Sequence, residues 1–183
     1  MKKTYLKNIL LLVAVTLFSM PAFAKEPSRT IEGVVTKVND GDTIQVTDDL
    51  GTKVKVRFYG MDAPETEKGN KRTGEISKPG QPFGENSFQA LRQKVDRQRV
   101  LLEVMAVDQY KRTVAIVWLG NRNINREMVA DGWAWAYRQY LDRAHAPEYI
   151  YAEEQARSQR KGIWQQGNDQ PPWEFRKAIK SEK

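Results

Sequence analysis

The sequence contains no cysteine and only one histidine among its 183 residues. The lack of thiols excludes a mini-protein held together by disulfides, and it also excludes zinc or iron–sulfur sites with cysteine ligands. A single histidine likewise excludes a histidine-rich metal centre. Hydrophobic residues make up 40% of the chain and charged residues 29%, too apolar a composition for a disordered polyelectrolyte. We therefore expect one folded, soluble domain in which any metal is bound through oxygen.

The sequence also lacks a hydrophobic run long enough to cross a membrane. Three lysines near the start precede an apolar run at residues 9–18, about half the roughly 20 residues that a span requires. Pro21 then breaks any helix before the small-residue segment Ala22-Phe23-Ala24. We interpret residues 1–24 as a secretory signal peptide, with a membrane anchor as the alternative. The mature protein is then exported, to a periplasm or to the medium.

The net positive charge of the chain is concentrated in a few segments, and the rest of the chain has little excess charge. Removing residues 1–24, which carry three lysines and no acid, lowers the formal charge from +7 to +4. Residues 157–183 hold seven basic and three acidic side chains and account for this excess. A second basic stretch, residues 68–78, shows no periodicity and is predicted to be a mobile loop. Both segments are compatible with a polyanionic partner, and equally with an ordinary solvated surface.

Alternation of apolar and polar residues predicts a mainly β core. The expected strands cover residues 30–39, 43–47, 53–59, 100–107 and 112–119. Asp40-Gly41 and the Asp48-Asp49-Leu50-Gly51 segment supply the turns between the first three strands. Helical spacing and end signals predict helices at residues 84–95, 124–131 and 148–161. Five short strands with these helices indicate an α+β protein built on a small Greek-key barrel of the OB type.

No internal repeat or second domain is visible in the rest of the chain. Residues 25–165 form the expected single domain, and the five tryptophans are interpreted mainly as packing residues. Residues 166–183 are left as a basic C-terminal tail that contains the Pro171-Pro172 pair, with disorder as an open alternative.

Two carboxylates are predicted to meet at one rim of this barrel. If the second and third strands pair through the turn near residues 49 and 50, Asp42 lies close to the end of the third strand. Asp62 follows just beyond that end, so the two side chains would repel each other unless a cation lay between them. Carboxylate and carbonyl oxygens without histidine or cysteine favour calcium. The alternative is that Asp40 and Asp42 only shape a turn.

Side chains suited to phosphate chemistry lie beside the predicted metal site. Arg57 belongs to the third strand, and Arg112 stands at the start of the fifth. Guanidinium groups donate paired hydrogen bonds to phosphate oxygens and can stabilise charge that develops there. Glu65 lies in the loop after Asp62 and could orient or deprotonate a water molecule. Together these residues indicate a metal-assisted phosphodiesterase, whereas each alone could form a surface ion pair.

Three segments of the chain resemble the signature blocks of the staphylococcal nuclease (thermonuclease) family. They are Asn39-Asp40-Gly41-Asp42-Thr43, Val56-Arg57-Phe58-Tyr59-Gly60-Met61-Asp62-Ala63-Pro64-Glu65-Thr66 and Asp108-Gln109-Tyr110-Lys111-Arg112. The second block is the most specific, because its four special residues keep both type and spacing. The resemblance covers about residues 30–165, nearly the whole mature chain.

This resemblance implies a five-stranded OB-fold barrel with three helices. It also implies a calcium-dependent endonuclease that cleaves DNA and RNA with little sequence preference and leaves 3′-phosphate and 5′-hydroxyl ends. By the same resemblance, Asp42 and Asp62 would be carboxylate ligands of Ca²⁺, and Ala63 would contribute its backbone carbonyl. The expected partners are nucleic acid substrates, with no stable protein partner, no membrane attachment after signal cleavage, and a monomeric state.

The remaining roles implied by the resemblance concern catalysis and substrate. Glu65 would act on the attacking water, while Arg57 and Arg112 would bind the scissile phosphate and stabilise the five-coordinate transition state. Tyr110 and Tyr140 would line the nucleotide pocket, where stacking holds a base without reading its sequence.

The chain departs from the family pattern at two positions beside these residues. Lys111 stands where the family usually has a glycine before the second arginine, which changes the freedom of the turn that positions Arg112. Ala63 replaces a common threonine, with little expected effect because only its carbonyl is needed. Two other readings are a non-catalytic OB-fold module that binds nucleic acid, and a domain that calcium merely stabilises.

Overall fold

The computed structural model describes residues 27–70, 72–167 and 170–181. The predicted signal peptide, residues 1–24, lies outside the described residues. Within the described part of the chain, no helix combines the length and the apolar character that crossing a membrane requires.

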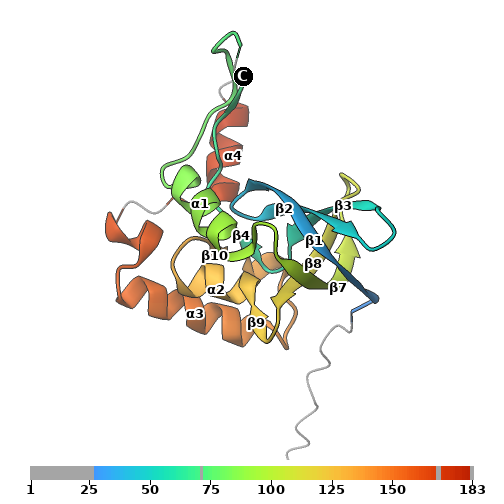
Figure 1. Cartoon of the computed structure of the whole chain (residues 1–183). Helices are drawn as coiled ribbons and strands as arrows, with labels where there is room; N and C mark the ends of the chain where they lie inside the picture. The colour runs from blue at the N-terminus through green and yellow to red at the C-terminus, as the bar shows by residue number, and fades with distance from the viewer. Residues whose placement is uncertain (1–26, 71, 168–169, 182–183) are drawn as a thin grey trace, which may run out of the picture.

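Five long strands form a closed, mixed β-barrel (Figure 1). They are β1 (Arg29–Asp40), β2 (Thr43–Asp48), β3 (Lys53–Phe58), β7 (Arg99–Val107) and β8 (Thr113–Leu119). The strand order is β3-β2-β1-β7-β8, and the short strand β9 (Arg122–Asn123) extends the sheet beyond β8. The barrel closes where β3, at one end of this order, pairs with β8 in parallel. The other neighbouring pairs of long strands are all antiparallel. The predicted five-stranded OB-type barrel is confirmed.

Alternation along each strand divides the core from the surface, as its sequence pattern predicts. In β3, Val56 and Phe58 are buried, while Lys53 and Lys55, on the opposite face of the strand, are exposed. The barrel interior also contains fully buried side chains from the other strands, among them Val35, Ile44, Leu102 and Val117. Burial of branched apolar side chains is the main favourable contribution to folding, so the strand pattern accounts for the barrel.

In the described part of the chain, four α-helices accompany the barrel: α1 (Gly84–Val95), α2 (Ile124–Ala130), α3 (Ala146–Ser158) and α4 (Pro172–Ser181). The first three correspond to the helices expected from the sequence. The fourth, α4, lies in the segment for which no element was predicted. Pro172 is its first residue, a position where the missing N–H and the fixed φ of proline favour a helix start. The proline pair thus begins a helix here.

The basic segment at residues 68–78 contains a short hairpin, whereas the sequence predicted a loop without regular structure. Strand β5 (Lys68–Gly69) pairs antiparallel with β6 (Ile76–Lys78). The hairpin projects from the same end of the molecule as α4 (Figure 1). Strands of two and three residues give too little periodicity to detect from sequence.

A close backbone contact joins the end of α2 to the segment after α3. Gly132 and Gly162 both have positive φ, and a Cβ on Gly162 would lie 2.1 Å from the carbonyl oxygen of Gly132. The amide of Ile163 donates a hydrogen bond to that same oxygen at 2.9 Å. Only glycine permits this approach, which fixes the start of the 3₁₀ turn η2 (Gly162–Gln165) against the barrel domain.

Candidate active site

The candidate site lies where β2 begins and β3 ends. Thr43 pairs with Arg57 across these strands, and the amide of Phe58 donates a hydrogen bond to the carbonyl oxygen of Asp42 at 2.9 Å. The hairpin therefore brings Asp42 to the end of β3, as its turn signals predicted. Asp40 also shapes this turn, because its Oδ1 accepts a hydrogen bond from the Asp42 amide at 3.3 Å.

Asp62 is held against this rim by a second, two-stranded sheet. It lies in β4 (Met61–Asp62), which pairs antiparallel with β10 (Trp135–Ala136). Asp62 is fully buried, and the following Ala63 amide points at Asp42 Oδ2 with an N–O distance of 3.4 Å. The two carboxylates thus approach each other from separate sheets.

Arg57 binds both carboxylates. Its Nη1 lies 2.8 Å from Asp42 Oδ2, and its Nη2 lies 2.7 Å from Asp62 Oδ1. Burial by itself would raise the pKa of Asp42, but the charge of Arg57 and hydrogen bonds from neighbours lower it to about 2. Burial raises the pKa of Asp62 despite hydrogen bonds from Arg176, and the charge of Asp42 adds to the rise. Crowded acidic groups of this kind are a common property of functional sites.

Glu65 lies beside the pair of aspartates and has two cationic partners. Its Oε1 accepts a hydrogen bond from Arg176 Nη1 at 2.9 Å, and its Oε2 accepts one from Lys78 Nζ. The backbone of Glu65 is fixed by Gln81, whose amide donates to the Glu65 carbonyl oxygen at 2.8 Å. Gly84 leaves room for that carbonyl, since a Cβ there would lie 2.1 Å from it. The start of α1 therefore positions the Glu65 loop.

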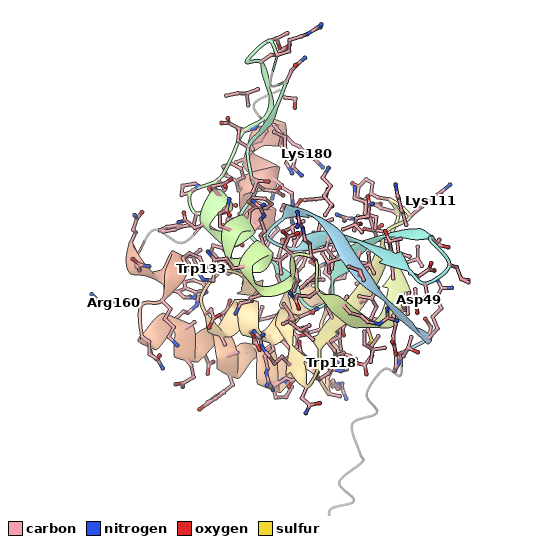
Figure 2. The ribbon with its side chains drawn as sticks, viewed as in Figure 1. Asp49, Lys111, Trp118, Trp133, Arg160 and Lys180 are labelled. Atoms are coloured by element: carbon pink, nitrogen blue, oxygen red, sulfur yellow. The ribbon has the colours of Figure 1, made fainter. Side chains whose placement is uncertain are left out.

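Arg112 immediately precedes β8, the strand that closes the barrel against β3, and lines the same site. Asp108 organises its turn: Oδ1 accepts hydrogen bonds from the amides of Tyr110 and Arg112, and Oδ2 accepts one from Arg112 Nε at 2.7 Å. Lys111 stands at the tip of this turn (Figure 2) with a φ of 60°. That left-handed conformation explains why a glycine is usual at this position.

These side chains surround a polar cavity of about 180 Å³. Its lining includes Asp40, Asp42, Arg57, Ala63, Glu65 and Arg112, with Lys55, Lys68 and Lys78. Six of the eight residues that the sequence analysis singled out therefore converge, five in the lining and Asp62 through Arg57. The cavity combines carboxylates with several basic groups, an arrangement suited to a cation and a phosphate.

The two predicted nucleotide-pocket residues, Tyr110 and Tyr140, do not line this cavity. They are 70% and 60% exposed. The Tyr110 ring lies near the Arg112 guanidinium, 5.5 Å from ring centroid to Cζ, so it borders the site. The Tyr140 ring instead packs edge-on against Tyr137, with centroids 4.7 Å apart.

Sequence reasoning missed Arg176, Lys78 and Asp108 as members of the site. Arg176 lies 114 residues from Asp62 in sequence, yet it donates two hydrogen bonds to that carboxylate, of 3.1 and 2.6 Å. The only signal for Arg176 and Lys78 was their membership of the two basic segments. Asp108 belonged to a recognised block, and its place four residues before Arg112 could have indicated a turn-forming partner.

The oxygen donors present fit a hard divalent cation. Among residues 27–70, 72–167 and 170–181, no group of three or more histidine, cysteine or acidic side chains is arranged to hold a metal. Asp42 and Asp62 can supply two carboxylates and Ala63 a backbone carbonyl, which leaves further positions to water or substrate. Hard cations commonly combine a few protein oxygens with water in this way.

Comparisons with known proteins show similarity to nucleases over most of the chain. The family model described as "Staphylococcal nuclease homologue" matches residues 55–166. Protein ParB of Escherichia coli is 37% identical over 174 residues, covering 90% of this chain and 87% of the relative. Micrococcal nuclease of Shigella flexneri is 37% identical over 176 residues, covering 91% and 90%. An uncharacterized endonuclease of Haemophilus influenzae is 33% identical over 174 residues, covering 95% and 88%.

The fold and the family match define the class of protein as a nuclease homologue built on an OB-type barrel. The family model covers more than half of the chain, and it spans Arg57, Asp62, Glu65 and Arg112. The chain therefore belongs to the staphylococcal nuclease family, as the resemblance of its motifs predicted.

Proposed function

We propose that this protein is an exported, calcium-dependent endonuclease that hydrolyses phosphodiester bonds of DNA and RNA with little sequence preference. The observation that carries the proposal is the cavity in which Asp42, Asp62, Glu65, Arg57 and Arg112 converge. A nucleic acid is the substrate class that combines repeated phosphates with little need for base recognition. Basic side chains around the cavity would attract such a polyanion.

Asp42, Asp62 and the carbonyl of Ala63 would hold the calcium ion. When bound, the ion would neutralise charge on the scissile phosphate and help to orient it. The buried position of both aspartates favours this role, because a desolvated pair of carboxylates needs nearby positive charge. Arg57 supplies such charge through its contacts with both.

Glu65 is the proposed general base for the attacking water. Its carboxylate lines the cavity beside the aspartates, and its backbone is fixed by Gln81. Arg57 from β3 and Arg112 from the turn before the neighbouring β8 would bind the phosphate and stabilise charge that grows on its oxygens. In-line attack on the phosphorus would release a 5′-hydroxyl and leave a 3′-phosphate. Tyr110 would lie beside the phosphate-binding Arg112, while Tyr140 would contact nucleotides outside the cavity.

Cleavage assays on the purified mature chain test this proposal directly. Supercoiled plasmid, single-stranded DNA and RNA would be incubated with calcium or with a chelator. Glu65→Gln keeps the shape of the side chain but removes the base, and we expect it to lower kcat by about 10²–10⁴-fold. Glu154→Gln, an equal change at an exposed position on α3, is the matched control and should cleave like the wild type.

The products and the mature terminus provide two further readouts. Cleaved DNA should resist polymerase extension until a phosphatase removes its 3′-phosphate. N-terminal sequencing of the exported protein should begin at Lys25. Salt-sensitive binding without cleavage, in any divalent metal, would instead establish the non-catalytic OB-fold module.

A further inference from the structure

Helix α4 carries a cationic side chain into the candidate active site. Arg176 Nη2 and Nη1 donate hydrogen bonds to Asp62 Oδ2 and Oδ1 at 2.6 and 3.1 Å. Nη1 also donates to Glu65 Oε1 at 2.9 Å. One guanidinium thus spans the proposed metal ligand and the proposed general base. Paired hydrogen bonds between ionised groups are among the stronger polar interactions in proteins.

The position of α4 is also supported by contacts outside the cavity. The Trp173 ring stacks on Tyr137, with centroids 5.0 Å apart and planes within 3°. Trp173 also packs against an apolar cluster of Trp135, Ile163, Trp164 and Ala156. Before the helix, the carbonyl oxygen of Gln170 accepts a hydrogen bond from Gln81 Nε2 at 2.6 Å. Helix α4 is therefore held in place by contacts that do not involve Arg176.

Arg176 uses the oxygen atoms that a cation at Asp62 would need. Oδ1 of Asp62 already accepts a hydrogen bond from Arg57, so both Asp62 oxygens have guanidinium partners. Asp42, Asp62 and Glu65 together can carry three negative charges, which Arg57, Arg176 and Lys78 balance. A divalent ion added to this arrangement would leave a large excess of positive charge in a largely buried site, which is unfavourable.

Arg176 is the cation best placed to leave. Arg57 belongs to the barrel strand β3 and contacts both aspartates, and its side chain is 17% exposed. Arg176 is 30% exposed and belongs to the last helix described in the chain. Its displacement requires only movement of a side chain or a terminal helix, whereas displacement of Arg57 would disturb strand β3.

We propose that Arg176 is a tethered cation that competes with the divalent metal ion for Asp62 and Glu65. Docking of α4 then inhibits the site by keeping Arg176 on both carboxylates, and metal binding loosens the helix. This inference rests on the proposed function, because it concerns regulation of the same site. By reciprocity, if Arg176 lowers the affinity for the metal, then the metal lowers the stability of the Arg176 contact by the same factor.

Calcium affinity is the primary test, measured by isothermal titration calorimetry on the full mature chain. Arg176→Gln should bind calcium about tenfold more tightly than the wild type, the size expected for one good, partly exposed ion pair. Arg176→Lys, which keeps the charge but not the paired donors, should lie between them. Lys177→Gln removes an equal charge from an exposed neighbour on the same helix and should match the wild type. Circular dichroism would verify that each variant folds.

Hydrogen exchange of the wild type tests the reciprocal effect. Saturating calcium should accelerate exchange of the α4 amides while it slows exchange around Asp42 and Asp62. Equal or weaker calcium binding by Arg176→Gln, relative to Lys177→Gln, would overturn the competition. Unchanged or slower exchange in α4 with calcium would overturn the release of the helix.

The outcomes also separate this inference from the proposed function. If the wild type binds calcium and cleaves DNA but Arg176→Gln has unaltered affinity, the nuclease proposal stands and the competition is wrong. If neither protein binds calcium, the metal requirement of the proposed function fails, and the competition fails with it.

Discussion

Two arginines bind the same buried carboxylate, and they come from very different parts of the molecule. Arg57 lies five residues from Asp62 and reaches it from the adjoining barrel strand. Arg176 lies 114 residues away and reaches it from a helix at the other end of the chain. The Arg57 contact is set by one hairpin and the turn that follows it, so it can be inferred from local sequence patterns. The Arg176 contact depends on a helix that docks on the barrel, and therefore on packing between distant parts of the fold.

The two arginines should also differ in what they contribute to stability. Arg57→Ala would leave Asp42 and Asp62 buried without their shared partner, and we expect a loss of roughly 3–5 kcal/mol in the free energy of unfolding. Arg176→Ala should cost about 1 kcal/mol, because Arg57 and Lys78 still neutralise the carboxylates and the lost pair is partly exposed. Urea denaturation in the presence of a chelator measures both values. Equal losses would show that α4 is as integral to the site as β3.

A smaller effect is expected when the packing of α4 is weakened without altering its charge. Trp173→Ala removes the stack on Tyr137, and we expect docking of the helix to weaken by about 2 kcal/mol. Hydrogen exchange in α4 should accelerate, and calcium affinity should rise toward that of Arg176→Gln. Trp173→Phe retains an aromatic ring and serves as the control. If the helix undocks but the calcium affinity is unchanged, docking of α4 does not control calcium binding.

The smallest expected effect concerns Lys111, in the turn that positions Arg112. Lys111 adopts a left-handed conformation that costs a non-glycine residue about 1–2 kcal/mol, and glycine removes this cost. The greater freedom of glycine in the unfolded chain offsets part of the gain. Lys111→Gly should therefore stabilise the protein by up to about 1 kcal/mol, measured by thermal denaturation. Lys55→Gly, on a strand, should instead destabilise it. A destabilised Lys111→Gly variant would show that the lysine side chain compensates for its backbone strain.

Sequence patterns predicted the parts of the fold that rest on local rules. Alternation in β3, through Val56 and Phe58, indicated a strand, and Asp40-Gly41 indicated the hairpin that brings Asp42 to Arg57. The α4 helix could not be predicted in the same way, because the proline that begins it also resembles the start of an irregular tail. The contact of Arg176 with Asp62 has no local signal, since it depends on where Trp173 finds a packing partner.

The exposed tyrosines show a different limit. Family resemblance placed Tyr110 and Tyr140 at a nucleotide pocket, but their positions depend on turn and 3₁₀ geometry rather than on strand pairing. Tyr110 remains beside Arg112 because Asp108 organises that turn. Tyr140 follows the chain after β10 and packs on Tyr137, so its relation to the cavity could not be inferred from spacing.

The covalent connection between α4 and the barrel has a quantitative consequence. Since η2 is fixed against Gly132, the chain that leads to α4 starts from a defined point, and Arg176 acts at an effective concentration set by its linker. An inhibitor on a separate chain is lost when the protein is diluted, but an attached one is not. The threshold at which calcium displaces Arg176 should therefore be the same in a concentrated compartment and in a large external volume.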